Sequence, residues 1–333
     1  MRSFIRITTR RPFSTYRHPK PFTIHPTDPT SFAETWTNQS SRKPTKFPAS
    51  TFTPHLPAFT NWFLPNSPNQ LNIPYLLTLS SNVTSQVPLE VTIPTTGETD
   101  ITNLPFTAFL GYLSAPSIHP SSPRLYLAQH PPPHFLTNDL PPPFPHLGFT
   151  IRSPSRDPDP ETNNIKKQID IYTTSLWLSR SSQTTNTPLH RDPNDNLFLQ
   201  LCGSKIIRTI PPTIGDKIFK HLYNHQKLSS TDPRGRIRDG LLTPKESGVM
   251  DRVIWGGEGG GVDGVEEEVI EYINNSSEEK EGGIYQTTVE RGEGVYIPAG
   301  WWHTVKSVLP EDIEEQESKG VATVVASMNW WFR

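Results

Sequence analysis

Short apolar runs separated by Gly, Pro, Ser and Thr recur along much of this chain, and the pattern predicts β-strands more than helices. In the C-terminal half we place strands at residues 169–172, 175–179, 197–201, 205–210, 289–297 and 321–332. Cys202-Gly203-Ser204 predicts a hairpin between the third and fourth of these runs. Weaker runs at 75–79, 89–93 and 125–128 predict further strands in the N-terminal half. We therefore expect a mainly β protein.

The remaining segments predict few helices and much irregular chain. Short helices are expected at 105–113 and 216–226. From 29 to 68, Pro, Ser, Thr and Phe dominate without a sustained period, which indicates an extended wrapper with aromatic anchors such as Trp36 and Phe47. Residues 256–283 are rich in Gly and Glu, so we expect a mobile insertion loop there.

Composition narrows this picture. The 333 residues are only 33% hydrophobic and include 36 prolines, so we expect a loop-rich protein around a smaller packed centre. A net charge of -2 offers no global electrostatic reason to bind nucleic acid or an anionic membrane. Cys202 is the sole cysteine, which excludes an internal disulfide and a cysteine-based zinc site and favours a reducing compartment. No apolar run approaches the roughly 20 residues that span a bilayer.

The N-terminal segment has the composition of a mitochondrial presequence. Residues 1–27 contain no acidic side chain, whereas arginines are spread among Ser, Thr and apolar residues. Arg11-Pro12-Phe13-Ser14 also resembles a matrix-peptidase cleavage site. The alternative is a disordered basic tail. We expect a soluble protein of the mitochondrial matrix.

The chemistry of the chain centres on His190 and Asp192. Two residues apart on extended backbone, their side chains lie on one face and can reach one ion, while Arg191 between them points to the other face. His303 follows the Pro298-Ala299-Gly300 turn and is the candidate third ligand. Two histidines and one carboxylate form the facial triad that holds non-haem Fe(II). A lone histidine is a weak signal in a chain with 11 of them, so the prediction depends on the combination.

These residues carry a family resemblance. Residues 187–212 and 292–331 resemble the JmjC or cupin-like group of Fe(II) and 2-oxoglutarate-dependent oxygenases, most of all its small hydroxylase branch. The spacing Gly292-x5-Pro298-x-Gly300-x2-His303 also follows the second general cupin motif. The resemblance implies a double-stranded β-helix, or jelly-roll, barrel in which His190, Asp192 and His303 hold the iron.

With this resemblance the chain divides into three expected parts. Residues 1–27 would be the presequence, and 28–165 a Pro-rich region whose strands complete the barrel. Residues 166–333 would be the catalytic core, interrupted by the insertion at 256–283.

The resemblance also implies a 2-oxoglutarate pocket. Lys205 would pair with the distal carboxylate, because a dianion that enters a partly dry barrel needs a cation. Thr187 and Tyr126 would reach the same carboxylate through their hydroxyls. Asn196 and Asn329 would line the pocket, where their amides could orient the 1-carboxylate or bound oxygen.

We therefore hypothesise a dioxygenase that uses Fe(II), 2-oxoglutarate and O2 to hydroxylate a protein side chain or an RNA nucleoside. Two alternatives stay open: a cupin-fold binding or scaffold protein without turnover, and a cupin metalloenzyme that does not use 2-oxoglutarate. The complete triad argues against the first, and Lys205 with Thr187 argues against the second.

Many members of this branch pair through C-terminal helices. Because the sequence stops at Arg333, directly after its last predicted strand, we do not expect such a dimer.

Overall fold

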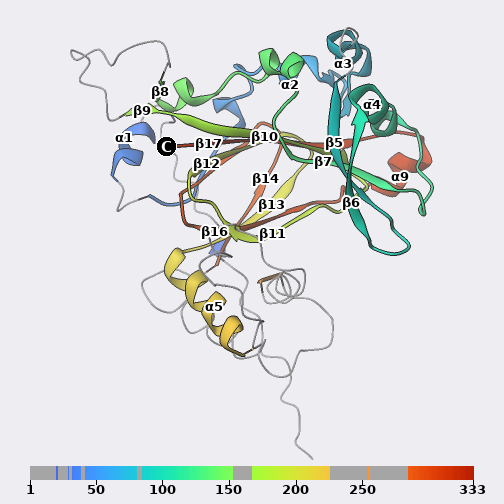
Figure 1. Ribbon diagram of the computed structural model, residues 1–333. Coiled ribbons are helices and arrows are strands. Elements are labelled where there is room, and N and C mark those ends of the chain that lie inside the picture. Colours follow the sequence, from blue (N-terminus) through green and yellow to red (C-terminus); the bar gives the residue numbers. More distant parts are fainter. Residues whose placement is uncertain are drawn as a thin grey trace, which may run out of the picture.

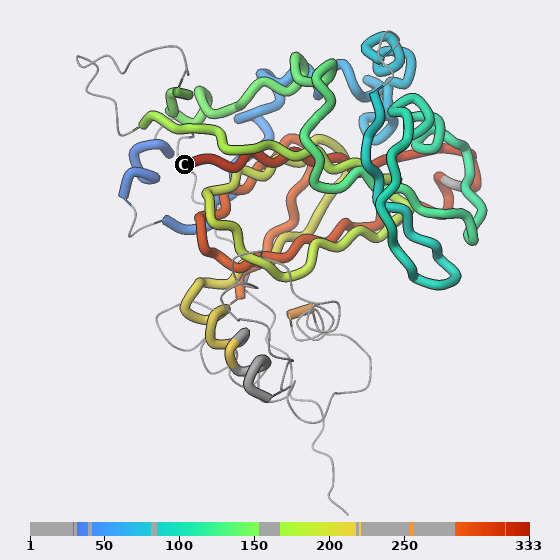
Figure 2. Tube along the Cα trace, viewed as in Figure 1, coloured from blue at the N-terminus to red at the C-terminus, as the bar shows by residue number. Residues whose placement is uncertain are grey.

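A computed structural model describes residues 20–21, 29, 32–38, 42–80, 85–152, 167–225, 254–255 and 284–333. The insertion predicted at 256–283 lies outside these residues, as does nearly all of the presequence predicted at 1–27. Figures 1 and 2 show strands that form two facing layers, with the short helices at the periphery.

Two sheets make up these layers. The smaller has five strands in the order β1 (Lys20–Pro21), β14 (Tyr285–Val289), β13 (Lys205–Ile210), β16 (Trp302–Ser307) and β11 (Asn186–Arg191). The larger has eight, in the order β2 (Thr45–Phe47), β15 (Gly294–Ile297), β12 (Asp195–Cys202), β17 (Val324–Phe332), β10 (Ile171–Arg180), β7 (Arg124–His130), β5 (Gln86–Thr92) and β6 (Thr99–Pro105). Within both sheets, neighbouring strands are antiparallel except β1 and β14. The chain crosses repeatedly from one sheet to the other, which confirms the expected jelly-roll barrel.

The hairpin expected around Gly203 is wrong. β12 pairs with β15 and β17 in the larger sheet, whereas β13 pairs with β14 and β16 in the smaller one. Gly203, with φ +67°, carries the chain between the sheets, and an added Cβ there would lie 3.0 Å from Val325 Cγ2. A glycine turn between two apolar runs looks the same in sequence whether it joins neighbours in one sheet or crosses between two.

The single strand expected at 289–297 is also two strands in different sheets, β14 and β15. Gly292 lies between them with φ +86°, and an added Cβ would lie 2.5 Å from Thr53 Cγ2. The segment from His190 to Asp192 leads in the same way from β11 of the smaller sheet to β12 of the larger.

The strand expected at 75–79 is wrong as well, because these residues belong to helix α3 (Ile73–Ser80). Leu76 and Ser80, one helical turn apart, are its buried residues. Asn72 caps the helix, since its side-chain oxygen accepts the Tyr75 N–H at 3.4 Å. A five-residue apolar run does not distinguish a helix from a strand by period alone.

The other helices are short. The two that were expected are α4 (Phe106–Ser114) and α5 (Pro212–His225). The rest are α1 (Phe32–Thr37), α2 (Ala58–Asn61), α9 (Ile313–Ser318) and three 3-10 turns at Ala49–Thr51, His134–Asp139 and Phe144–Leu147. Two small strand pairs, Phe63–Leu64 with Ser67–Leu71 and Thr150–Ile151 with Gln168–Ile169, complete the described elements. Among the described residues, no helix has the length and apolarity needed to cross a bilayer.

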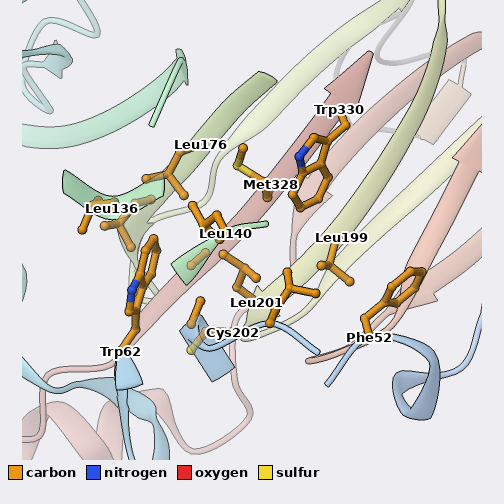
Figure 3. Packing of buried hydrophobic residues seen from close by; sticks show 14 of the residues in the cluster. Phe52, Trp62, Leu136, Leu140, Leu176, Leu199, Leu201, Cys202, Met328 and Trp330 are labelled. Carbon is orange, nitrogen blue, oxygen red and sulfur yellow. The ribbon is translucent and has the colours of Figure 1, made fainter. Parts of the chain in front are cut away.

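The main core lies between the larger sheet and the N-terminal segments, not inside the barrel (Figure 3). Alternate residues of β12, Leu197, Leu199 and Leu201, pack into this core. The predicted anchors Trp36 and Phe47 are buried in it, so the wrapper packs on the sheet. The residues of β12 that alternate with these leucines, among them Asn196 and Phe198, therefore face the barrel interior.

Candidate metal centre and cosubstrate pocket

Strand pairing brings the three predicted ligands together. His190 on β11 lies directly opposite His303 on β16, and the centroids of the two rings are 4.1 Å apart. Asp192 follows the end of β11; its Oδ1 is 3.8 Å from His190 Nε2 and its Oδ2 is 3.5 Å from His303 Nε2. The three ligand atoms lie within 4.8 Å of one another, and no other such group of three occurs among the residues described.

Backbone carbonyls orient both imidazoles. His190 Nδ1 donates to Pro188 O at 2.8 Å, and His303 Nδ1 donates to Trp301 O at 3.1 Å. A carbonyl only accepts, so Nδ1 of each ring carries a proton, and Nε2 of each ring faces Asp192. Second contacts of this kind are typical of metal-binding histidines.

Asp192 is held in its ionised form. Burial by itself raises the pKa of this carboxyl, but His303 and His190, together with hydrogen bonds from Trp331 and Asn196, outweigh burial and hold the pKa below its ordinary value. Trp331 Nε1 donates to Asp192 Oδ2 at 2.6 Å. Burial, reinforced by His190, lowers the pKa of His303, so this imidazole is neutral at physiological pH. Neutral imidazole and ionised carboxylate are the forms that bind a metal.

The donor set fits Fe(II). Two imidazole nitrogens and one carboxylate oxygen on one side of a common point make the facial triad, which leaves further positions for other ligands. His190 and Asp192 side chains are 22% and 18% exposed, whereas His303 is 3% exposed. The centre is therefore reached from the His190 side.

Thr187 shares the inner face of β11 because of a β-bulge. Thr187 lies opposite Val305 and His190 lies opposite His303, with a register shift between the two pairs. Residues three apart in a regular strand face opposite ways, so the extra residue of the bulge brings Thr187 to the side of the ligands.

Lys205 also faces the barrel interior. It lies opposite Ser307, two inward positions along β16 from His303. Its side chain is 4% exposed and spans the barrel, donating from Nζ to Ser327 Oγ on β17 at 2.9 Å. Burial lowers the Lys205 pKa to about 7. Among the ion pairs of the described residues, none includes Lys205.

Tyr126 and this lysine both approach Trp177. Trp177 connects the two, because its ring centroid is 6.0 Å from that of Tyr126 and 5.6 Å from Lys205 Nζ. The Tyr126 hydroxyl is hydrogen-bonded to the Thr185 side chain. Lys205, Thr187 and Tyr126 thus lie around the inner surface of one barrel.

Asn196 and Asn329 form a hydrogen-bonded relay to the metal ligand. Trp177 Nε1 donates to Asn329 Oδ1 at 2.8 Å, and Asn329 Nδ2 donates to Asn196 Oδ1 at 2.8 Å. Asn196 Nδ2 then approaches Asp192 Oδ2 at 3.3 Å. Each amide nitrogen keeps a second hydrogen for a bound molecule. The expected contacts with the cosubstrate or oxygen stay predictions.

Sequence reasoning missed the supporting roles of Trp331, Trp177 and Ser327. Trp330 belongs to the main core outside the barrel, whereas the Trp331 indole faces the interior and donates to Asp192. The alternation of β17 distinguishes them, because adjacent strand residues face opposite sides.

Arg191 points away from the ligands, as predicted. Its Nη1 lies 2.8 Å from Asp216 Oδ1 at the start of α5, and its guanidinium lies 5.3 Å from the Trp302 ring centroid. Trp302 Nε1 donates to the same Asp216 oxygen at 2.8 Å. An added Cβ on Gly215 would lie 2.2 Å from Trp302 Cδ1. The helix therefore packs closely behind the metal centre.

Comparison with known proteins agrees with the fold. The cupin-like domain family matches residues 95–333, more than half of the chain, and the protein belongs to that family. The chain is 26% identical over 134 residues to Jumonji C domain-containing protein 5 of Drosophila melanogaster, a match of 40% of this chain and 24% of that protein. It is 26% identical over 139 residues to Lysine-specific demethylase JMJ30 of Arabidopsis thaliana, covering 42% of this chain and 24% of that protein. The chain thus spans about a quarter of the length of these relatives.

Proposed function

We propose that this protein is an Fe(II) and 2-oxoglutarate-dependent dioxygenase that hydroxylates a protein side chain or an RNA nucleoside. His190, Asp192 and His303 would hold the iron. When bound, iron and 2-oxoglutarate together supply activation of O2, with one oxygen atom going to a substrate C–H bond and the other to succinate as CO2 is lost.

One observation supports the cosubstrate most strongly: Lys205 is a buried cation on the same inner face as the triad, without a carboxylate partner among the described residues. The hydrogen-bond partner of this buried ammonium is the Ser327 hydroxyl, and the rings of Trp177 and Phe198 lie 5.6 and 5.8 Å from it; burial of the charge is unfavourable and lowers the pKa of Lys205. A carboxylate of 2-oxoglutarate would offset this cost. A metalloenzyme that does not use 2-oxoglutarate has no such need.

The other residues would bind and orient the cosubstrate and exclude water from it. Thr187 and Tyr126 would offer hydroxyls to the carboxylate that Lys205 neutralises. Trp331 and Asn196 hold the Asp192 carboxylate through its Oδ2. Phe198, with Ile207 and Val305, belongs to the apolar cluster inside the barrel and would exclude water from the cosubstrate chain.

The substrate class is proposed from the family, with a protein side chain preferred to a nucleoside. One relative is named a lysine-specific demethylase, and lysine is a protein side chain. For this chain we propose hydroxylation. Comparative mass spectrometry of mitochondrial protein and RNA should then find a molecule that carries one more oxygen atom in wild-type cells than in cells that lack this protein.

An anaerobic titration tests the proposal. Protein loaded with Fe(II) should develop a metal-to-ligand charge-transfer band when 2-oxoglutarate is added, and should form succinate in air. His190→Ala should abolish both, whereas the matched control His119→Ala, a surface histidine bonded to Ser121, should change neither. Iron binding without the band would indicate a metalloenzyme that does not use 2-oxoglutarate. Absence of iron binding would indicate a scaffold protein.

A further inference from the structure

Asp195, three residues after Asp192, is a buried carboxylate that accepts four hydrogen bonds from two other parts of the chain. It is 3% exposed. Its Oδ2 accepts from Trp36 Nε1 at 2.7 Å and from Arg42 Nη1 at 3.0 Å. Its Oδ1 accepts from the Tyr296 hydroxyl at 3.0 Å and from the Ala299 N–H at 2.8 Å. Each carboxylate oxygen thus accepts two hydrogen bonds.

The contact with Ala299 joins the two ligand-bearing segments. Ala299 lies in the turn that leads to His303, and Asp195 begins the strand that follows Asp192. Beside this contact, the Gly300 N–H donates to the backbone carbonyl of Asp192 at 2.8 Å. Two hydrogen bonds therefore hold the turn before His303 against the loop that carries Asp192.

The contacts with Trp36 and Arg42 extend this connection to the N-terminal segment. Both residues lie upstream of the residues matched by the family. Arg42 Nε donates to the Trp36 carbonyl at 2.8 Å, and its guanidinium lies 4.1 Å from the centroid of the Trp36 ring. Trp36 also packs 5.9 Å from Phe332, and Figure 2 shows this N-terminal segment beside the C-terminal end of the chain. Arg42 supplies the opposite charge that a buried carboxylate requires.

We propose that Asp195 is a positioning residue for the metal centre, and that Trp36 and Arg42 of the N-terminal segment set its orientation. The inference rests on the proposed function, because it assigns these residues a role in holding the ligands of that centre. On this proposal Trp36 and Arg42, which precede the family domain, help to position the metal ligands.

A matched comparison separates this role from general stability. Asp139 is also buried and accepts from Trp62 Nε1 and the Tyr75 hydroxyl, both at 2.8 Å, but none of its partners belongs to a segment that carries a ligand. Asn at either position keeps one acceptor oxygen and loses the other. Asp195→Asn and Asp139→Asn should therefore both lower the melting temperature. Trp36→Phe and Trp62→Phe form a milder pair that removes one indole donor each.

Two measurements then test the proposal. Fe(II) affinity, measured anaerobically without 2-oxoglutarate, should fall about tenfold or more in Asp195→Asn and by a smaller factor in Trp36→Phe, while the Asp139 and Trp62 variants bind as wild type. Amide hydrogen exchange of the metal-free protein should show faster exchange at Ala299 and Gly300 in the Asp195 and Trp36 variants only.

The outcomes are distinct. Equal iron affinity and equal exchange in all four variants would overturn the positioning role and leave the proposed function intact. If the Asp139 and Trp62 variants lost the same iron affinity, lower stability alone would explain the effect, and the positioning role would again be overturned. If the wild-type protein itself bound no iron, the proposed function would fail first, and the exchange result alone would decide whether Asp195 holds the turn.

Discussion

His190 and His303 lie opposite each other on β11 and β16, with ring centroids 4.1 Å apart, and Asp192 approaches the Nε2 atom of both. Strand pairing and two backbone carbonyls set this arrangement.

Trp331→Phe should weaken Fe(II) binding by about tenfold, because it removes the indole hydrogen bond to Asp192 Oδ2 while keeping most of the ring. Trp177→Phe should have a smaller effect, since Trp177 reaches Asp192 only through Asn329 and Asn196. Anaerobic metal titration of both variants measures this order. Equal losses in the two variants, or a Trp331 variant that binds iron as wild type does, would contradict the role of Trp331 in holding the Asp192 carboxylate.

2-Oxoglutarate affinity should fall as pH rises above about 7, because burial lowers the pKa of Lys205 to about 7 in the free protein. Below this pH the lysine is charged in the free protein and ready for a carboxylate; above it, binding must take up a proton, so affinity should drop up to about tenfold per pH unit. The measurement is the dissociation constant at several pH values with iron present. Lys205→Met should abolish tight binding, and Lys319→Met, at an exposed position directly after helix α9, should not. A flat pH profile would contradict this role.

The same lysine predicts how stability changes with pH. An unfolded lysine keeps its proton up to a pKa near 10.5, so between about pH 7 and 10.5 the unfolded chain binds one more proton than the folded protein at this site. This site should therefore make the metal-free protein more stable as pH rises through that window, by at most about 1.4 kcal/mol per pH unit. Urea unfolding of wild type and Lys205→Met across this range isolates the contribution, and identical slopes would refute it.

Thr187→Val should weaken 2-oxoglutarate binding by up to about a hundredfold and leave iron affinity unchanged. The substitution keeps the shape and removes the hydroxyl that faces the barrel through the bulge of β11. Loss of one hydrogen bond to a charged group corresponds to about 1.5–3 kcal/mol at most. Thr288→Val, at an exposed position of β14, is the matched control. Lowered iron affinity in the Thr187 variant would instead indicate a disturbed bulge.

Gly203→Ala should lower the free energy of unfolding by more than Gly97→Ala does. Both glycines have positive φ, +67° and +71°, so alanine is strained by about 1–2 kcal/mol at either site. At Gly203 the new methyl also meets Val325 at 3.0 Å, whereas nothing lies within 4 Å at Gly97. Chemical denaturation of both variants gives the difference. Equal losses would show that the crossing between the sheets tolerates the methyl.

Residues 1–27 should direct a fused reporter to mitochondria, because they are rich in arginine and contain no acidic residue. Replacing the five arginines at positions 2, 6, 10, 11 and 17 with glutamine should leave the reporter in the cytosol. Fluorescence microscopy and fractionation read out the result. A reporter that stays in the cytosol with the unaltered segment would favour the disordered basic tail.

Local pattern was sufficient for the fold class and for the candidate ligands. Alternation and turn residues predicted most strands, and the His190 to Asp192 spacing places two side chains on one face of any extended segment. Pattern failed at 75–79, where a helix capped by Asn72 has the same apolar run as a strand, and at Gly203, where a sheet crossing has the sequence of a hairpin. Those cases depend on partners that a local run does not specify.

The sequence by itself therefore determined which residues have the chemistry for this centre: two imidazoles, one carboxylate and a lysine in cupin-like spacing. Only the tertiary structure decided that His303 lies opposite His190, that a bulge brings Thr187 to their side, and that Asp195 connects the N-terminal segment to the turn before His303. The physical reason is that ligand type is a property of single side chains, whereas proximity depends on strand register and on hydrogen bonds between distant segments.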